Sequence, residues 1–216
     1  MSRTPFRPPL VAVLSLGLAL VAACSPAPAD AAAPDDPEGT ERLATSLVAL
    51  FEQTLEQDRG LSDADREILR RAVDTGTIAP EDYDAAFARY ASCMDQAGFP
   101  QTWERTRAGL NRVTGPALPD EAAYDRYVDV SEECGGQHLA VVESLYGVQQ
   151  GNPDLLADPA AVALQCLRGI GAVDEGYTVE DFARDFDGDL DLLPFDVRDG
   201  DVDDCLYGAG FAVAVA

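Results

Sequence analysis

Four cysteines follow the first forty residues of this 216-residue chain, and their thiols offer the most varied chemistry. They are Cys93, Cys134, Cys166 and Cys205. An even number of cysteines in an exported chain favours disulfides, and four cysteines allow three pairings. We predict Cys93–Cys134 and Cys166–Cys205, because each pair joins consecutive predicted helices and closes a loop of about 40 residues. In the chain-entropy model such a loop stabilises the fold by roughly 4 kcal/mol.

Zinc binding and catalysis are the alternatives for these side chains. Cys134 and His138 stand four residues apart, which suits half of a zinc site, but no closely spaced cysteine pair completes it. His138 is the only histidine, so a Ser-His-Asp or Cys-His enzyme would have to use it. Because it shares a helical face with Cys134 and Val141, we expect a core histidine bonded to a backbone carbonyl. No nucleophile elbow or phosphate loop is present, and we predict no catalytic residue and no cofactor.

Carboxylates are abundant, with 39 acidic against 15 basic residues and a net charge of −24. This balance excludes nucleic acid as a partner, because phosphate binding needs clustered basic side chains. Alternating aspartates offer weak calcium candidates at Asp187, Asp189, Asp191, Asp199, Asp201 and Asp203. The Gly and Glu of an EF-hand loop are missing, so a solvated acidic loop is favoured. Glycan hydrolysis by two carboxylates is a further alternative. It requires a separation of roughly 5 to 9 Å between the two groups, which a sequence does not reveal.

Three arginines form a basic island in this acidic chain. Arg105, Arg107 and Arg112 lie within ten residues of one another. Our hypothesis is that they pack against the Asp-rich segment of the same domain, or against an acidic protein partner at the cell envelope.

These residues need a folded body to position them, and the apolar spacing predicts a mainly α domain over residues 40–216. Apolar side chains recur every three or four residues in about six to seven segments, as in amphipathic helices. The predicted helices cover 41–58, 61–76, 80–98, 119–148, 159–171, 178–186 and 201–210. Residues of about 99–118 contain Thr, Trp, Val and internal Gly, which favours a small β-hairpin over a helical turn.

A short pattern marks the ends of three of these helices. "CMDQAGF", "CLRGIGA" and "CLYGAGF" each place a Gly five residues after a cysteine. Gly adopts the left-handed conformation that ends a helix at little cost, so we predict Schellman caps at Gly98, Gly171 and Gly210. Each cap fixes a cysteine about one turn before the end of its helix.

The N-terminal residues have the order of an export signal. Arg3 and Arg7 precede the apolar stretch 10–23, which is too short to span a bilayer, and small residues then precede Cys24. Here the sequence resembles the lipobox of bacterial lipoproteins. This resemblance implies a signal peptide over 1–23 and a diacylglyceryl group on Cys24 as the membrane anchor. The Pro-, Ala- and Asp-rich residues 24–39 predict a flexible stalk.

Lipobox, stalk and paired cysteines together resemble small exported lipoproteins of unassigned function from high-GC Gram-positive bacteria. We therefore expect a lipid-anchored binding or scaffold protein on the extracytoplasmic face of the cell membrane. A carboxylate-dependent cell-wall glycan hydrolase and an accessory subunit of an envelope transporter are the alternatives.

Overall fold

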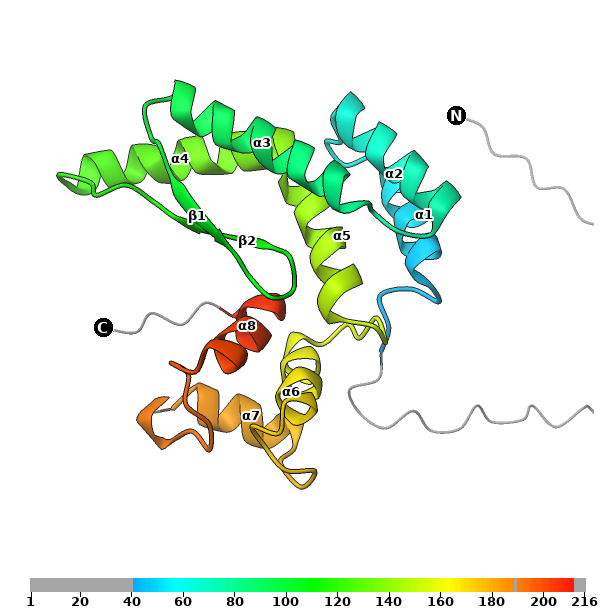
Figure 1. Cartoon of the computed structure of the whole chain (residues 1–216), viewed down its shortest axis with the longest axis vertical. Helices are drawn as coiled ribbons and strands as arrows, with labels where there is room; N and C mark the ends of the chain where they lie inside the picture. The colour runs from blue at the N-terminus through cyan, green and yellow to red at the C-terminus, as the bar shows by residue number, and fades with distance from the viewer. Residues whose placement is uncertain (1–40, 189, 212–216) are drawn as a thin grey trace, which may run out of the picture. The chain divides into compact units, whose positions relative to one another are not determined.

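The structure, a computed structural model, describes residues 41–188 and 190–211 (Figure 1). These residues form a mainly helical fold with one small antiparallel sheet, which confirms the predicted class. The elements are α1 (Leu47–Gln57), α2 (Asp63–Thr75), α3 (Pro80–Gln96), β1 (Thr102–Arg105), β2 (Asn111–Thr114), α4 (Glu121–His138), α5 (Ala140–Gly151), α6 (Pro159–Gly169), α7 (Val179–Phe186), the 3-10 helix η1 (Leu190–Leu192) and α8 (Gly200–Gly208). The predicted signal peptide (1–23), the stalk (24–39) and Cys24 lie outside the described residues.

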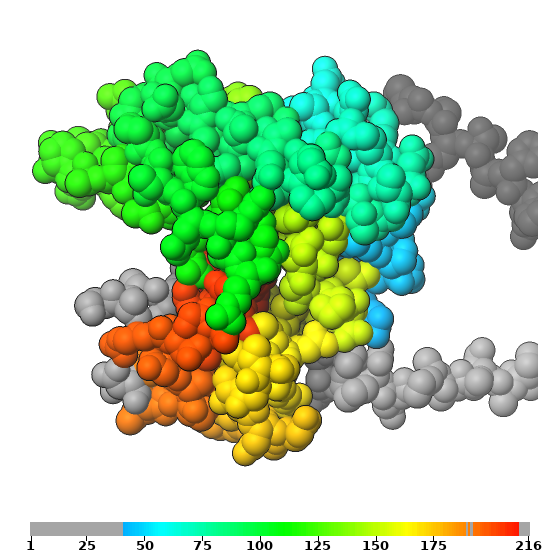
Figure 2. All heavy atoms as spheres, in the orientation of Figure 1, coloured from blue at the N-terminus to red at the C-terminus, as the bar shows by residue number. Residues whose placement is uncertain are grey.

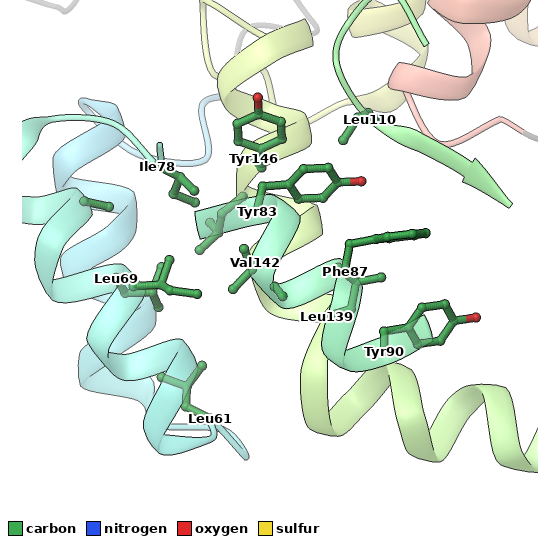
Figure 3. Close-up of a cluster of buried hydrophobic side chains, with 14 of the residues drawn as sticks. Leu61, Leu69, Ile78, Tyr83, Phe87, Tyr90, Leu110, Leu139, Val142 and Tyr146 are labelled. Atoms are coloured by element: carbon green, nitrogen blue, oxygen red, sulfur yellow. The ribbon is translucent and has the colours of Figure 1, made fainter. Parts of the chain in front are cut away.

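Buried side chains of the described residues form two clusters. The first is built by α1 to α5 and the hairpin, and its centre includes Phe51. Leu69, Tyr83 and Val142 of the same cluster are shown in Figure 3. The second is built by α6 to α8 and the segment before α8, and Phe182 lies within it. Each cluster gains its stability mainly from apolar area removed from water.

Each cluster also contains one disulfide. Cys93–Cys134 joins α3 to α4 with the Cα atoms 5.8 Å apart, and Cys166–Cys205 joins α6 to α8 with the Cα atoms 5.5 Å apart. These are the pairs that the loop lengths favoured. The Cys134 sulfur is therefore bonded to another sulfur and leaves no thiolate for a zinc half-site with His138.

The three predicted helix stops are all present as Schellman caps. Gly98, Gly171 and Gly210 have φ of +87°, +73° and +89°. In the first cap the Phe99 N–H donates to the Met94 carbonyl at 2.9 Å, and the Gly98 N–H donates to the Asp95 carbonyl at 3.0 Å. The caps at Gly171 and Gly210 repeat both bonds. The repeated heptamer is thus an architectural device that ends a helix just after a disulfide cysteine.

The predicted single helix over 119–148 is wrong, because the chain bends at Leu139 and forms α4 and α5 (Figure 1). Leu139 has φ −137° and ψ −45°, outside the helical region, and its side chain is buried. The bend lets α4 lie along α3 while α5 contacts α2, α3 and α8. A straight helix could not place both segments against these neighbours.

The predicted hairpin is present within 99–118. Trp103 pairs with Val113, and Glu104 pairs with Arg112, across the two antiparallel strands. At the tip, the Thr106 N–H donates to the Leu110 carbonyl at 2.8 Å, and Gly109 adopts φ +77°. The tip brings Leu110 into the first cluster. No helix among the described residues has the length and apolar character needed to cross a membrane.

Candidate binding site

A pocket of about 410 Å³ opens where α5, α8 and the hairpin meet, three elements that lie close together in Figure 2. We call it the Glu143 pocket, and its described lining is Leu110, Glu143, Ser144, Gly147, Val148, Tyr207, Gly208, Ala209, Gly210 and Phe211. Most of this lining is apolar, and Glu143 supplies its carboxyl group. A volume of this size lies within the range of about 300–1,000 Å³ that is common for small-molecule sites.

Glu143 is held by a short hydrogen-bonded chain that begins in the core. The Tyr83 hydroxyl donates to Glu143 Oε1 at 3.3 Å and accepts the backbone N–H of Asn111 at 2.8 Å. Tyr83 is fully buried and stacks on Tyr146, with ring centroids 4.5 Å apart (Figure 3). The core thus fixes the hydroxyl, and the hydroxyl orients the carboxyl group at the pocket wall.

Burial changes the acidity of the groups around the pocket. It raises the pKa of Glu143, an effect that the hydrogen bond from Tyr83 partly offsets. Burial also raises the pKa of Tyr207, and the nearby Glu143 carboxylate adds to this while Arg112 opposes it. The pKa of Tyr83 is raised for the same main reason. A half-buried carboxyl group with a raised pKa in a pocket is a common feature of functional sites.

The end of α8 makes the pocket still more favourable for positive charge. Its last residues, with Ala209 as the C-cap and Gly210 beyond it, form one wall. Aligned peptide dipoles give a helix a partial negative charge at this end. The Glu143 carboxylate and the end of α8 therefore both place negative charge at the pocket wall.

The basic island lies beside this pocket, and two of its three arginines reach the Asp-rich segment. Arg112 pairs with Asp203 at 2.6 Å and with Asp204 at 3.2 Å. Arg107 pairs with Asp201, and its backbone N–H donates to Asp204 at 3.1 Å. These bonds join the hairpin to α8, as one form of our hypothesis expected.

Arg105 has different partners. Its guanidinium bonds Asp84 of α3 at 2.5 Å and the Gly109 carbonyl at 2.7 Å. This arginine stabilises the hairpin against the first cluster rather than against the Asp-rich segment.

The calcium candidates that the structure describes are not brought together. No group of three or more possible metal ligands occurs among the described residues. Asp199 caps α8 by accepting the N–H of Asp201 at 2.8 Å, while Asp201 and Asp203 pair with arginines. Asp187 is exposed after α7, and Asp189 and the side chain of Asp191 lie outside the described part.

His138 is not the core histidine that its spacing suggested. The side chain is half-buried and lines an open groove with Arg89, Ser92 and Cys93. The bend that follows it at Leu139 takes α5 out of line with α4, so the face shared by His138 and Val141 is not continuous.

Glu143, Tyr83 and Tyr207 are not among the candidate residues that the sequence patterns predicted. A local signal for Glu143 exists, because it is the only charged residue in the stretch 139–148. A lone charge on a largely apolar helix is costly to bury unless it has a partner or a role. The partners, however, come from distant segments, and Tyr83 lies 60 positions away.

No family model matches the chain, and comparisons with curated proteins and with solved structures also find no match.

Proposed function

We propose that this protein is a lipid-anchored binding protein on the extracytoplasmic face of the cell membrane. The observation that carries the binding role is the Glu143 pocket, which is mostly apolar and presents an oriented carboxyl group. Such a lining suits recognition of a small molecule or of a protruding group on an envelope partner. The lipid anchor rests on Cys24 and on the order of charged, apolar and small residues before it.

The pocket favours binding over glycan hydrolysis. Hydrolysis commonly uses two carboxyl groups that flank the bond, about 5 to 9 Å apart. Among the described residues that line the pocket, Glu143 is the only one with a carboxyl side chain. The nearby Asp203 and Asp204 are held by Arg112 at the hairpin.

The anchor is tested by feeding an alkyne-tagged fatty acid to bacteria that express the full chain. We expect tagged wild-type protein in the membrane fraction, accessible to protease on intact cells. Cys24→Ser removes the acceptor thiol and abolishes the label, whereas the neighbouring Ser25→Ala variant retains it. Label that persists in Cys24→Ser, or protein that protease cannot reach, contradicts the proposed anchor and location.

Glycan hydrolysis is tested by incubating the purified full-length protein with isolated cell wall. We expect no release of reducing ends above the buffer control. Release that Glu143→Gln abolishes would instead establish the hydrolase alternative.

A further inference from the structure

We propose that the Glu143 pocket binds an organic monocation, namely an ammonium group carried on an apolar body. The charged head would lie at the Glu143 carboxylate, and the body would lie against Val148, Tyr207 and Phe211. This inference rests on the proposed binding function and names its ligand class.

The first argument is an uncompensated charge. The ion pairs of the described residues give no arginine to Glu143, and its one hydrogen-bond donor is the neutral Tyr83 hydroxyl. Arg112, a nearby guanidinium, is occupied by Asp203 and Asp204 and lies over the Tyr207 ring at 4.9 Å. A half-buried carboxylate without a counter-charge favours a ligand that supplies one.

The second argument is the negative charge around the pocket. The carbonyl end of α8 carries partial negative charge at the pocket wall, and the whole chain has a net charge of −24. An anionic ligand would be repelled by both. A neutral apolar ligand would fill the space but leave the carboxylate desolvated without a counter-charge.

The third argument separates an organic cation from a metal ion. Calcium and magnesium take six or more oxygen ligands, several of them from protein carboxylates. The described residues contain no group of three possible metal ligands. The apolar lining offers dispersion contacts and an aromatic ring instead, which suit a hydrocarbon body.

The proposal makes affinity depend on pH in a defined direction. Burial raises the pKa of Glu143, so part of the population is protonated at mildly acidic pH. A bound ammonium stabilises the carboxylate, and binding to the protonated form must release a proton. Affinity therefore falls as pH falls through the raised pKa. The carboxyl group is faced by the neutral hydroxyls of Tyr83 and Tyr207 and by the end of α8, and the neighbouring positive charges are Arg105 over the Tyr83 ring and Arg112 over the Tyr207 ring.

The test compares three probes that share a phenyl ring and differ in their head group. Isothermal titration of the purified full-length protein in maltoside detergent uses 2-phenylethylammonium, 2-phenylethanol and 3-phenylpropionate. We expect the ammonium to bind roughly tenfold or more tightly than the alcohol, as a charged hydrogen bond implies, and the carboxylate to bind most weakly. Equal affinities for the three heads, or no binding of the ammonium, would overturn the proposal.

Two variants and one control locate the binding. Glu143→Gln keeps an acceptor for Tyr83 and should lose the preference for ammonium while retaining the alcohol. Glu132→Gln, on the exposed surface of α4, removes the same charge and should change nothing. Ser144→Trp should block both the ammonium and the alcohol, because Ser144 is an exposed residue of the lining. An unchanged preference in Glu143→Gln would contradict the inference, while fatty-acid labelling of Cys24 would still report on the proposed function separately.

Discussion

Tyr83 is the residue that connects the buried core to the pocket. Its ring stacks on Tyr146 within the first cluster, and its hydroxyl bonds both the Asn111 N–H and the Glu143 carboxyl group. Asn111 is buried, so its N–H has no access to bulk water if the hydroxyl is removed. A single phenol oxygen thus satisfies a strand donor and orients the pocket carboxylate.

We predict that Tyr83→Phe destabilises the fold by about 1–3 kcal/mol, because it leaves a buried N–H unsatisfied. Urea denaturation followed by circular dichroism measures the change in the free energy of unfolding. Tyr124→Phe is the matched control, since Tyr124 is 57% exposed and should change stability by less than about 0.5 kcal/mol. Equal midpoints for both variants would mean that the hydroxyl of Tyr83 is not needed by Asn111.

At the scale of single elements, the helix ends are fixed by glycines whose conformation no other residue adopts cheaply. Gly98 has φ +87°, and an added Cβ would meet no atom within 4 Å. Substitution there would therefore cost backbone strain alone. Gly136 also has open space around its Cβ position, but it lies inside α4. Neither position is crowded, so the two glycines differ only in the backbone conformation that they adopt.

We predict opposite effects for the same substitution at these two positions. Gly98→Ala should destabilise by about 1–2 kcal/mol, the cost of a left-handed conformation. Gly136→Ala should stabilise by about 0.5–1 kcal/mol, because it restricts the unfolded chain and favours the helix. Thermal unfolding of both variants measures the pair, and a stabilising Gly98→Ala would show that the cap does not require φ above zero.

Local patterns predicted the elements whose causes are local. Each cap at Gly98 and Gly171 depends on the residues of one helix end, and the hairpin depends on one turn. Each disulfide pair was predicted from the number of residues between its cysteines. The bend at Leu139 was not predicted, because leucine favours helix and the apolar spacing continues through it. Its cause is tertiary, since α5 contacts α8, which begins only at Gly200. The role of Glu143 was not predicted for the same reason, because its neighbours Tyr83 and Tyr207 come from α3 and α8.

In the described molecule, ion pairs between the hairpin and α8 join the two buried clusters. Arg112 is 26% exposed, bonds Asp203 and Asp204, and covers the ring of Tyr207. The Tyr207 hydroxyl in turn donates to the Asn111 carbonyl at 3.3 Å. The sequence suggested that arginines of the island would contact the Asp-rich segment, but not which of them contributes most to stability. The exposed fractions indicate Arg112, because Arg107 is 75% exposed and water screens its ion pair.

We predict that Arg112→Gln lowers the free energy of unfolding by about 1–2 kcal/mol, since it removes a cation–π contact and three ion pairs, to Asp203, Asp204 and Glu104. Arg107→Gln should cost less than about 0.5 kcal/mol. Arg70→Gln corrects for the change in net charge, because Arg70 is exposed and forms no ion pair with the described residues. Urea denaturation at low salt and in 1 M NaCl measures all three variants.

Salt separates a specific contact from the general repulsion of an acidic chain. Raising salt should shrink the cost of Arg112→Gln, because it screens the lost attraction to Asp203 and Asp204. A double-mutant cycle with Asp204→Asn isolates that pair, and we expect a coupling of about 0.5–1 kcal/mol. If Arg112→Gln costs no more than Arg70→Gln, the ion pairs do not join the clusters. The clusters would then be joined by their other contacts, which include the packing of α5 against α8 and the hydrogen bond from the Tyr207 hydroxyl to the Asn111 carbonyl.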